Sequence, residues 1–403
     1  MSQLPQQKSN SNINSHSTEY RKTVSIFGCT GSIGKNVYQL VKENINRFEV
    51  VVLVAKNNWQ ELLEQAKILK PKFIVIEDES NYQNLKNAVN ISKINCQVLS
   101  GADAIVETAK IKVDLIFMAI VGAVAIMPTI TAIKAGSNLA IANKESLVIA
   151  GNFITEMARL NNINLIPLDS EHNAILQIFE NHNLENISNI TLTASGGPFF
   201  NNKKPLDKIT IAEAINHPKW QMGAKISVDS ATMMNKGLEL IEAYHLFAID
   251  KSQIKVLIHP QSIVHGMVQY SDGSNLAMLS YPNMQTPISL ALNFPKRTAV
   301  SKIKPLDLAE ISRLDFFEVD YLYFPTLKLA IEALNSNDTA VVALNAANEI
   351  AVAAFLNNEI SFDKISNIIA KTLETIAHHK INSIEEVLFF DQQFRNLTKS
   401  LCH

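Results

Sequence analysis

Short apolar runs alternate with amphipathic segments over the first 168 residues. The apolar runs are rich in β-branched residues, as buried strands are, whereas the segments between them repeat their apolar positions at helical spacing. Strands are expected at residues 23–27, 50–54, 73–76, 96–99, 113–120, 138–142 and 164–167. Helices are expected up to residue 41, at 59–69, 84–89, 102–109 and 128–135, and up to residue 160. This alternation predicts a parallel, doubly wound sheet covered on both faces.

After residue 168 the pattern becomes mixed and finally helical. A strand is expected at 190–194, an amphipathic helix reaching residue 247, and an antiparallel sheet from 256–258, 263–270 and 275–280. From residue 326 onward the apolar spacing is helical. We therefore expect an α/β fold in five parts: a disordered N-terminal extension at 1–20, a Rossmann-like doubly wound sheet at 21–168, an α+β domain at 169–293, a linker at 294–325 and a C-terminal helical bundle at 326–403.

A glycine-rich turn, Gly-Cys-Thr-Gly-Ser-Ile-Gly at residues 28–34, joins the first strand to the first helix. In this arrangement backbone N–H groups and a helix N-terminus meet the pyrophosphate of a dinucleotide. The spacing is GxxGxxG and departs from the GxGxxG fingerprint, so the triplet alone is weak evidence. Its position after the first strand of a doubly wound sheet favours a dinucleotide site.

The second strand ends at Ala55-Lys56-Asn57-Asn58, without an acid that would hold a ribose 2′-hydroxyl. A cation and amides at this point suit a 2′-phosphate, so we predict NADP(H) in preference to NAD(H). The alternative is that Lys56 is an ordinary surface lysine.

A polar turn, Leu-Asp-Ser-Glu-His-Asn-Ala-Ile at residues 168–175, follows the seventh apolar run. Asp169 and Glu171 are two apart in what reads as irregular backbone, so their carboxylates can converge on one point. Hard oxygen donors suit Mg²⁺ or Mn²⁺, whereas zinc prefers Cys or His. The alternative is that Asp169 or Ser170 merely caps the helix that follows.

Polar groups also follow two other predicted strands. Asn143-Lys144-Glu145-Ser146 comes after the strand at 138–142, and Ser195-Gly196-Gly197-Pro198 after the strand at 190–194. Because ligands gather at the carboxyl ends of such strands, we expect Lys144 to lie beside the cofactor. The free N–H groups and the Ser195 hydroxyl suit an anion, although Gly-Gly-Pro is also typical of a plain chain reversal.

One of the two tryptophans, Trp220, lies in the segment His-Pro-Lys-Trp-Gln-Met-Gly at residues 217–223. Pro218 lies near the start of the segment and Gly223 at its end, as is typical of a loop. We interpret it as a lid that closes over a substrate. A tryptophan anchored in the core is the ordinary alternative.

Asn235, Lys236 and Glu239 can share one face of the helix that reaches residue 247. Glu239 stands among leucines and isoleucine, which predicts partial burial, and a buried carboxylate needs a partner. A metal ion would be one such partner, and Lys236 in a plain ion pair would be another.

Composition excludes several classes of function. The formal net charge is −2, with no basic stripe for nucleic acid. The longest apolar run, 115–127, is shorter than the roughly 20 residues of a membrane span. The three cysteines have no metal-binding spacing and are too few for a disulfide framework, which favours a reducing cytoplasm. Residues 1–20 are polar and do not resemble a secretory signal.

Blocks along the chain closely resemble the 1-deoxy-D-xylulose 5-phosphate reductoisomerase family. The likeness runs from about residue 21 into the C-terminal domain, in family order. The blocks are GCTGSIG at 28–34, ANKESLV at 142–148, LDSEHNAI at 168–175, SGGPF at 195–199, HPKWQMG at 217–223, SVDSATMMNKGLE at 227–239, HPQS at 259–262 and LNAANEIAVAAF at 344–355.

The resemblance implies an enzyme of the non-mevalonate isoprenoid pathway that uses NADPH and Mg²⁺ or Mn²⁺, with Co²⁺ as an alternative. It would convert 1-deoxy-D-xylulose 5-phosphate to 2-C-methyl-D-erythritol 4-phosphate, as a homodimer of three-domain subunits inhibited by fosmidomycin. By similarity the metal ligands are Asp169, Glu171 and Glu239. The matching catalytic and substrate positions are Lys144, Ser170, Ser195, His217, Trp220, Met222, Ser230, Asn235, Lys236 and Glu239. The matching cofactor positions are Thr30, Gly31, Ser32, Ile33, Lys56, Asn57, Asn58, Asn143, Glu145 and Gly223.

One block departs from the family. Where members have Ala-Gly-Lys-Asn, this chain has Ala55-Lys56-Asn57-Asn58, which moves the cation by one position. Two other functions fit parts of the pattern: an NADP-linked sugar-phosphate or aldehyde dehydrogenase without a metal, and a non-enzymatic dinucleotide-sensing module. Clustered carboxylates of the metal-binding type argue against both.

Overall fold

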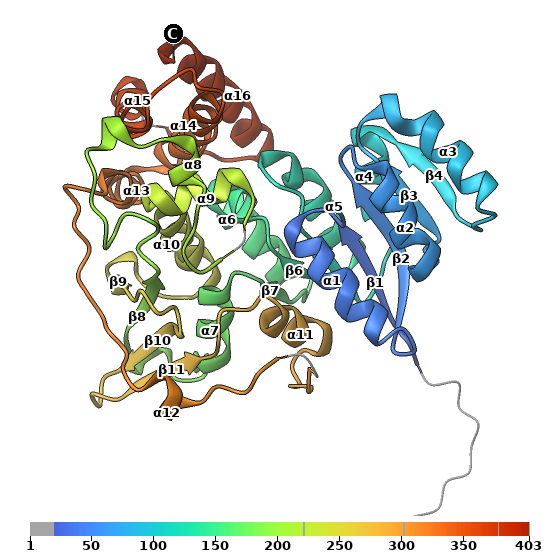
Figure 1. Cartoon of the computed structure of the whole chain (residues 1–403), viewed down its shortest axis with the longest axis horizontal. Coiled ribbons are helices and arrows are strands. Elements are labelled where there is room, and N and C mark those ends of the chain that lie inside the picture. The colour runs from blue at the N-terminus through green and yellow to red at the C-terminus, as the bar shows by residue number, and fades with distance from the viewer. Residues whose placement is uncertain (1–19, 221, 301–302, 378, 403) are drawn as a thin grey trace, which may run out of the picture.

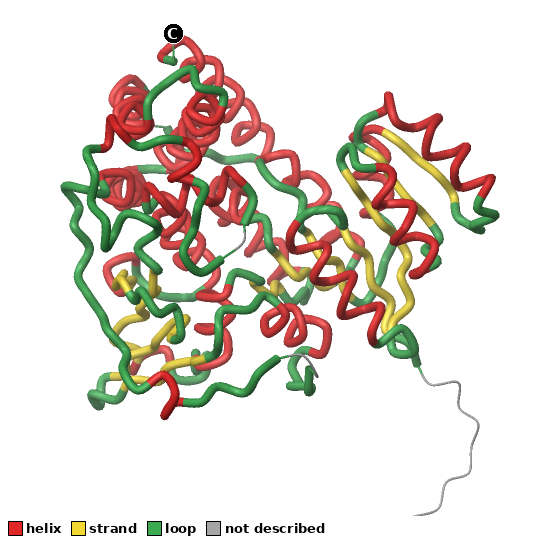
Figure 2. The backbone as a smooth tube through the Cα atoms, in the orientation of Figure 1, coloured by secondary structure: helices red, strands yellow, loops and turns green. Residues whose placement is uncertain are grey.

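The computed structural model describes residues 20–220, 222–300, 303–377 and 379–402 (Figure 1). The expected disordered extension lies, apart from Tyr20, outside the described residues. An α/β domain stands on one side, while a second sheet and a group of C-terminal helices form the larger body (Figure 2). The three predicted kinds of architecture are therefore present, and the predicted fold class is confirmed.

Seven parallel strands of the described chain form the N-terminal sheet, in the order β4-β3-β2-β1-β5-β6-β7. Their bounds are β1 Lys22–Phe27, β2 Phe48–Ala55, β3 Phe73–Ile76, β4 Gln97–Ser100, β5 Leu115–Met118, β6 Asn138–Ile141 and β7 Leu165–Pro167. The chain builds outward from β1 to β4 and then restarts on the other side of β1 with β5. Ligands bind at such a reversal, beyond the carboxyl ends of the strands.

Helices cover both faces of this sheet. They are α1 Ser32–Glu43, α2 Trp59–Leu69, α3 Tyr82–Ile91, α4 Gly101–Ala109, α5 Ile126–Ala135 and α6 Lys144–Leu160. Neighbouring residues of β1 point to opposite faces, so Ile26 packs in the core under α1 and α2 and Phe27 in the core under α5 and α6. The double burial explains why these strands read as continuous apolar runs.

The second sheet has the order β11-β10-β8-β9 among the described residues. Its strands are β8 Ile187–Ala194, β9 Ile254–Ile258, β10 Val264–Tyr270 and β11 Asn275–Leu279. The expected antiparallel pairing is correct for β10 with β11. β9, expected in the same antiparallel sheet, pairs instead in parallel with β8, a strand that was not predicted in this sheet and that pairs antiparallel with β10. The reason is the long connection through α9 Ala224–Thr232 and α10 Met234–Leu246, since a helical crossover allows parallel pairing.

Helix α7, Ser170–Ile178, begins earlier than expected. Glu171 therefore lies in a helical first turn and not in irregular backbone. An acidic residue is stable there because it faces the positive end of the helix dipole. Asp169 remains outside the helix, at its N-cap.

The region expected as a linker carries some structure of its own. It includes α12 Leu308–Ile311, and Phe317 forms a β-bridge with Ile258. Just before it, α11 Gln285–Asn293 packs on the N-terminal sheet, where Ile288 and Leu292 join the core that contains Ile26. The chain thus returns to the nucleotide side before it enters the helical region.

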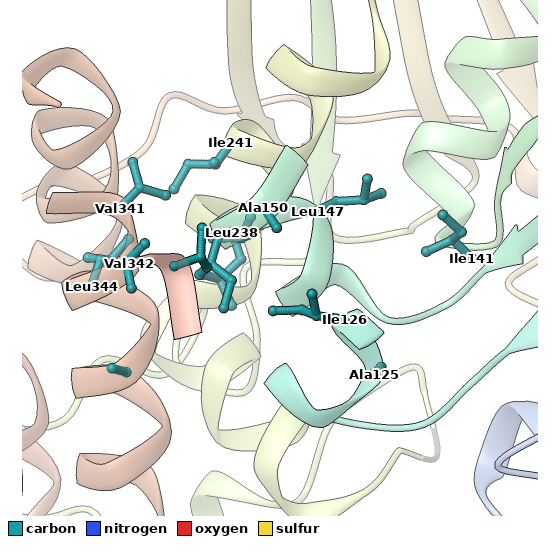
Figure 3. Packing of buried hydrophobic residues seen from close by; sticks show 14 of the residues in the cluster. Ala125, Ile126, Ile141, Leu147, Ala150, Leu238, Ile241, Val341, Val342 and Leu344 are labelled. Atoms are coloured by element: carbon teal, nitrogen blue, oxygen red, sulfur yellow. The ribbon is translucent and has the colours of Figure 1, made fainter. Parts of the chain in front are cut away.

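The C-terminal region is helical, as predicted. Its helices are α13 Pro325–Ser336, α14 Asp338–Leu356, α15 Phe362–Thr375 and α16 Ile384–Leu401. Val342 and Leu344 of α14 pack with Leu238 of α10 and Leu147 of α6 in one core (Figure 3). Helix α14 has the length and hydropathy of a membrane span, but 78% of that window is buried in this core.

Short helices complete the described chain. They are α8 Ile211–Ala214 and the 3-10 helices η1 Glu79–Asn81, η2 Ala123–Ala125, η3 Leu184–Asn186, η4 Leu206–Lys208 and η5 Lys251–Gln253.

Candidate functional site

A cavity of about 470 Å³ lies where the carboxyl ends of several strands meet α9 and α10. The turns after β1, β5, β6, β7 and β8 contribute Gly31, Ala119, Lys144, Asp169 and Ser195 to its wall. Residues far apart in the sequence therefore share one enclosed space. The N-terminal sheet and the second sheet both reach it.

The glycine turn forms one end of the cavity. Gly28 has a φ of 91°, and a Cβ there would lie 2.4 Å from the carbonyl oxygen of Ala119. Gly31 is the N-cap of α1, and Gly31, Ser32 and Ile33 line the cavity. The backbone can therefore approach a ligand closely at the N-terminus of α1, as a pyrophosphate site requires.

The remaining residues expected at the nucleotide phosphates lie farther out. Thr30 is half-buried, whereas Lys56, Asn57 and Asn58 are exposed beyond β2. The Asn58 side chain caps α2 by accepting the Glu61 N–H at 3.1 Å. In the part of the chain that the structure describes, these four residues do not line the cavity.

Glu145 lines the cavity at the start of α6, and Asn143 is buried beside it without lining the cavity of the described chain. Asn143 caps this helix through Ser146 N–H at 2.9 Å and donates to the carbonyl oxygens of Ile120 and Gly122 at 2.7 and 3.0 Å. It therefore ties the loop after β5 to α6. Glu145 is 5% exposed and faces Lys225.

Three carboxylates meet at the opposite end of the cavity around two lysines. Lys144 Nζ lies 2.5 Å from Asp169 Oδ2 and 3.2 Å from Glu239 Oε1. Lys236 Nζ lies 2.7 Å from Glu171 Oε1 and also contacts Glu239 Oε2. The structure thus brings the three predicted metal ligands together, and the ion pair between Lys236 and Glu239 is also present.

The capping alternative for Asp169 is wrong. Asp169 occupies the N-cap of α7, yet in the described structure its side chain accepts no capping hydrogen bond. The carboxylate faces Lys144 instead. Ser170 Oγ donates to Glu171 Oε2 at 2.7 Å and so orients the second carboxylate of the cluster.

Burial and charge act in opposite directions on this cluster. Burial, together with Glu242 and Glu239, raises the pKa of Asp169 to about 6 against the lowering effect of Lys144. Burial also raises the pKa of Glu171, but Lys236 outweighs it and holds that pKa at about 2. Burial lowers the pKa of Lys144, but the surrounding carboxylates raise it well above its ordinary value. At Asp169, burial and the neighbouring carboxylates therefore outweigh Lys144, whereas at Glu171 the charge of Lys236 outweighs burial.

The donor set fits a hard divalent cation. Carboxylate oxygens at the edge of a cavity, without a cysteine, are typical ligands of Mg²⁺ and Mn²⁺. Behind them lies a second group, Asp169, His172 and Glu242, whose ligand atoms are within 4.8 Å of one another. His172 is fully buried, with Nε2 2.8 Å from the Glu239 carbonyl oxygen and Nδ1 3.1 Å from Glu242 Oε2. Because His172 is fully buried and its Nδ1 lies at ion-pair distance from Glu242, we favour Asp169, Glu171 and Glu239 as the ligands.

A hydroxyl donor for an anion is built from Ser195 and His217. His217 Nδ1 accepts the N–H groups of Lys219 and Trp220 at 3.1 and 2.9 Å, so the ring hydrogen is on Nε2. Nε2 donates to Ser195 Oγ at 2.9 Å, and Gly197 N–H donates to the same oxygen at 3.1 Å. With both lone pairs of Oγ occupied, the Ser195 hydroxyl hydrogen is left for a ligand. Burial lowers the pKa of His217 to about 4, which agrees with a neutral ring.

The other predicted residues of the site also line the cavity. Trp220 is half-buried, with its ring 6.4 Å from that of His265, and Met222 and Gly223 follow it in the wall. Asn235 accepts from Lys144 Nζ at 2.7 Å and donates to Glu239 at 2.5 Å. Asn235 and Lys236 therefore contact the carboxylates in this structure. Ser230 lines the cavity beside the Ser-Gly-Gly turn, since a Cβ on Gly197 would lie 2.7 Å from the Ser230 carbonyl oxygen.

Several residues of the site were not predicted. His265 lines the cavity next to Trp220, and His172 and Glu242 lie behind the carboxylates. The signals were present, because His172 follows Glu171 directly and Glu242 stands three residues after Glu239 on the same helix. Lys225 pairs with Glu145, but apart from its position next to the predicted lid nothing in the sequence indicated that it belongs to the site.

A dinucleotide-type turn and a carboxylate cluster at two ends of one cavity define a class: a metal-assisted, dinucleotide-dependent oxidoreductase. Three family profiles match the chain: 1-deoxy-D-xylulose 5-phosphate reductoisomerase over residues 24–151, its C-terminal domain over 165–247, and the DXP reductoisomerase C-terminal domain over 279–397.

Individual relatives agree. The reductoisomerase of Zymomonas mobilis is 44% identical over 93% of this chain and 96% of its own length, and that of Buchnera aphidicola subsp. Schizaphis graminum is 44% identical over 93% and 97%. A solved Zymomonas mobilis enzyme in complex with NADPH matches with a TM-score of 0.88 and 41% identity over 95% of this chain and all of that one. A solved DOX-P reductoisomerase in complex with NADPH, fosmidomycin and magnesium gives 0.88 and 38% over 94% and 98%. The chain belongs to the 1-deoxy-D-xylulose 5-phosphate reductoisomerase family.

Proposed function

We propose that this chain converts 1-deoxy-D-xylulose 5-phosphate to 2-C-methyl-D-erythritol 4-phosphate with NADPH and a divalent metal, in the non-mevalonate route to isoprenoid precursors. Membership of the family supports the reaction, and the named complexes of its solved relatives with NADPH, magnesium and fosmidomycin support the cofactors. The single observation that carries the proposal is the meeting of Asp169, Glu171 and Glu239 in the cavity that the glycine turn closes.

The carboxylates of Asp169, Glu171 and Glu239 would hold Mg²⁺ or Mn²⁺, with Co²⁺ as an alternative. When bound, such an ion acts as a Lewis acid and template for neighbouring substrate oxygens. Ser170 orients Glu171 through its hydroxyl, and Asn235 orients Glu239 through its amide. Lys144 lies in the same cluster and places a positive charge beside the reacting end of the substrate.

The nucleotide would lie along the glycine turn toward the carboxylates. Thr30, Gly31, Ser32 and Ile33 bind the diphosphate through the turn and the N-terminus of α1. Lys56, Asn57 and Asn58, which are exposed beyond β2, would meet the 2′-phosphate. Glu145 and Gly223, which line the cavity, would face the inner half, and Asn143 would support it through its hydrogen bond to Glu145. NADPH, when bound, supplies the hydride that reduces the rearranged aldehyde.

The substrate phosphate would bind at the Ser-Gly-Gly turn. Ser195 offers its hydroxyl hydrogen because His217 and Gly197 occupy its lone pairs. Ser230 stands next to it, and Lys236 supplies positive charge from α10. Phosphate binding far from the reacting carbons supplies orientation. Trp220 and Met222, on the segment between His217 and Gly223, are placed to cover the bound substrate and exclude water.

We further propose a cytoplasmic homodimer that binds neither nucleic acid nor membranes. Net charge −2 gives no attraction to phosphate polymers. β11 is an edge strand of the second sheet and exposes Leu276, which is 42% exposed. An unpaired apolar edge of this kind is usually covered, and a second copy would cover it symmetrically.

The proposed domain division keeps the predicted bounds: nucleotide binding at 21–168, catalysis and metal binding at 169–293, a linker at 294–325 and a helical domain at 326–403. The packing of α11 on the nucleotide side shows contact across these bounds. Limited proteolysis that cuts within 294–325 before any other described loop would support the division.

The test follows NADPH absorbance at 340 nm with 1-deoxy-D-xylulose 5-phosphate, with and without Mg²⁺. The proposal expects oxidation that needs both substrate and metal and that fosmidomycin stops. Full activity in a chelator would indicate a metal-independent dehydrogenase. NADPH binding without oxidation by any sugar phosphate would indicate a sensing module.

A further inference from the structure

A second cluster of charges lies in the cavity wall, away from the predicted metal ligands. Lys225, in the first turn of α9, has its Nζ 3.0 Å from Glu145 Oε1 and 2.8 Å from Asp229 Oδ2. The side chains of Glu145 and Asp229 are 7% and 1% exposed, whereas that of Lys225 is 25% exposed. All three residues line the cavity. Lys225 is thus the member of the cluster that solvent or a ligand can reach.

The cluster joins parts of the molecule that are far apart in sequence. Glu145 belongs to α6 of the nucleotide side, and Lys225 to the helix that follows the predicted lid. Asn143, which donates to Glu145 Oε2 at 3.1 Å, also holds the loop after β5 against which Gly28 packs. Glu145 is thus connected through Asn143 to the loop beside the glycine turn, and it directly follows Lys144 of the carboxylate cluster.

The C-terminal helices hold the other side of the cluster. Asn348 of α14 donates to Asp229 Oδ1 at 2.9 Å. Arg395 of α16 contacts Glu349 at 2.7 Å and Asp391 at 2.6 Å. Burial lowers the pKa of Lys225, but Asp229, Glu145 and Glu349 raise it above its ordinary value. Asn348 thereby holds the carboxylate of Asp229, and Asp229 in turn holds the ammonium group of Lys225 beside Glu145.

We propose that Lys225 is a positioning residue for the nicotinamide half of NADPH. The inference rests on the proposed function, which brings NADPH into this cavity with its diphosphate on the glycine turn. To reach the substrate, the nicotinamide half must then pass along the part of the cavity wall that Lys225 and Glu145 form. A carboxylate accepts hydrogen bonds from ribose hydroxyls, and an ammonium donates to hydroxyl or carboxamide oxygens. Because Lys225 and Glu145 form an ion pair, each holds the other in position for its contact with the nicotinamide half.

The test compares NADPH with a fragment that lacks nicotinamide. Binding of NADPH and of 2′,5′-ADP is measured by calorimetry or fluorescence on the full chain, without substrate or metal. In Lys225→Met, we expect the Kd of NADPH to rise about 10-fold and that of 2′,5′-ADP to change less than twofold. Lys225→Arg keeps the charge and should recover most of the NADPH affinity.

Two further variants separate positioning from folding. Lys225→Met leaves the buried Asp229 without its cation, which could destabilise the fold. The double variant Lys225→Met with Asp229→Asn removes both charges. It should have the melting temperature of the wild type and should still lose affinity for NADPH but not for 2′,5′-ADP. Lys72→Met breaks another lysine pair of 3.0 Å, with Glu49, on the surface of the nucleotide-binding domain, and should change neither affinity.

Equal NADPH affinity in the folded Lys225 variants would overturn the inference, and so would an equal loss for NADPH and 2′,5′-ADP. Failure of the wild-type chain to bind NADPH would instead refute the proposed function.

Discussion

The two ends of the cavity are built by different means. At the nucleotide end, the backbone of the Gly28–Gly34 turn and the N-terminus of α1 form the wall, and the closest constraints are steric. At the acidic end, side chains of α6, α7 and α10 form the wall, and the constraints are electrostatic. A backbone site should tolerate changes of charge and fail when a Cβ is added. A side-chain site should lose function when one charge is removed, even where the substitution causes no steric clash.

The largest effect is expected at the acidic end. Glu239→Gln preserves volume but removes the carboxylate that contacts both Lys144 and Lys236. We expect kcat/KM at limiting Mg²⁺ to fall about 1000-fold, or roughly 4 kcal/mol, because metal affinity is lost. Because Glu239 is also a buried partner of two lysines, kcat/KM is compared at a temperature where the variant is folded. Glu310→Gln, an exposed carboxylate paired with Lys304, is the control and should retain full activity.

A somewhat smaller effect, on folding, is expected at the nucleotide end. Gly28→Ala places a methyl group 2.4 Å from the Ala119 carbonyl oxygen at a φ of 91°. We expect the free energy of unfolding to drop by about 3 kcal/mol in urea denaturation, since strain and a clash combine. Gly31→Ala is the matched control in the same turn, because its Cβ would meet only the Gly28 carbonyl oxygen at 3.3 Å. Equal stability of the two variants would contradict the steric account.

An intermediate effect is expected where the phosphate would bind. Ser195→Ala removes the hydroxyl hydrogen that His217 and Gly197 leave available. We expect KM for 1-deoxy-D-xylulose 5-phosphate to rise about 10- to 30-fold, or roughly 2 kcal/mol, with NADPH affinity unchanged. Ser188→Ala, on the exposed face of the same strand, should have no effect. An unchanged KM would place the phosphate elsewhere.

The smallest effect concerns the pH dependence of stability. Burial lowers the pKa of His217 to about 4 in the folded chain, below about 6.5 in the unfolded chain. The unfolded chain therefore binds more protons between these values, and the contribution of His217 is complete above pH 6.5 and is lost as the pH falls toward 4. The ring is partly exposed, so solvent screening reduces the full effect, and over this range the wild type should lose about 1 kcal/mol more unfolding free energy than His217→Gln. Parallel pH curves for the two proteins would show that the ring is not held neutral.

Local pattern predicted the parts of the molecule that depend on local physics. The buried strands around β1, the helix at Trp59–Leu69 and the glycine turn follow from apolar periodicity and backbone freedom. The convergence of Asp169 with Glu171 also follows from their spacing, although Glu171 stands in a helix and not in a loop.

What depends on contacts between distant segments was not predictable in the same way. The parallel pairing of β9 with β8 depends on a helical crossover, and no property of either strand reveals it. Lys144 and Glu239 are 95 positions apart, so their ion pair could not be read from periodicity. The joining of Glu239 to Asp169 and Glu171 came from family resemblance, whereas the Lys225 cluster appeared only in three dimensions.

The central claim is that Asp169, Glu171 and Glu239 hold the metal, and not the buried group of Asp169, His172 and Glu242. Titration of Mn²⁺ followed by electron paramagnetic resonance tests it most directly, with Glu171→Gln and Glu242→Gln compared with the wild type. The account predicts that Glu171→Gln weakens Mn²⁺ binding about 10-fold or more and that Glu242→Gln weakens it less than threefold. Strong loss in Glu242→Gln with wild-type affinity in Glu171→Gln would contradict it.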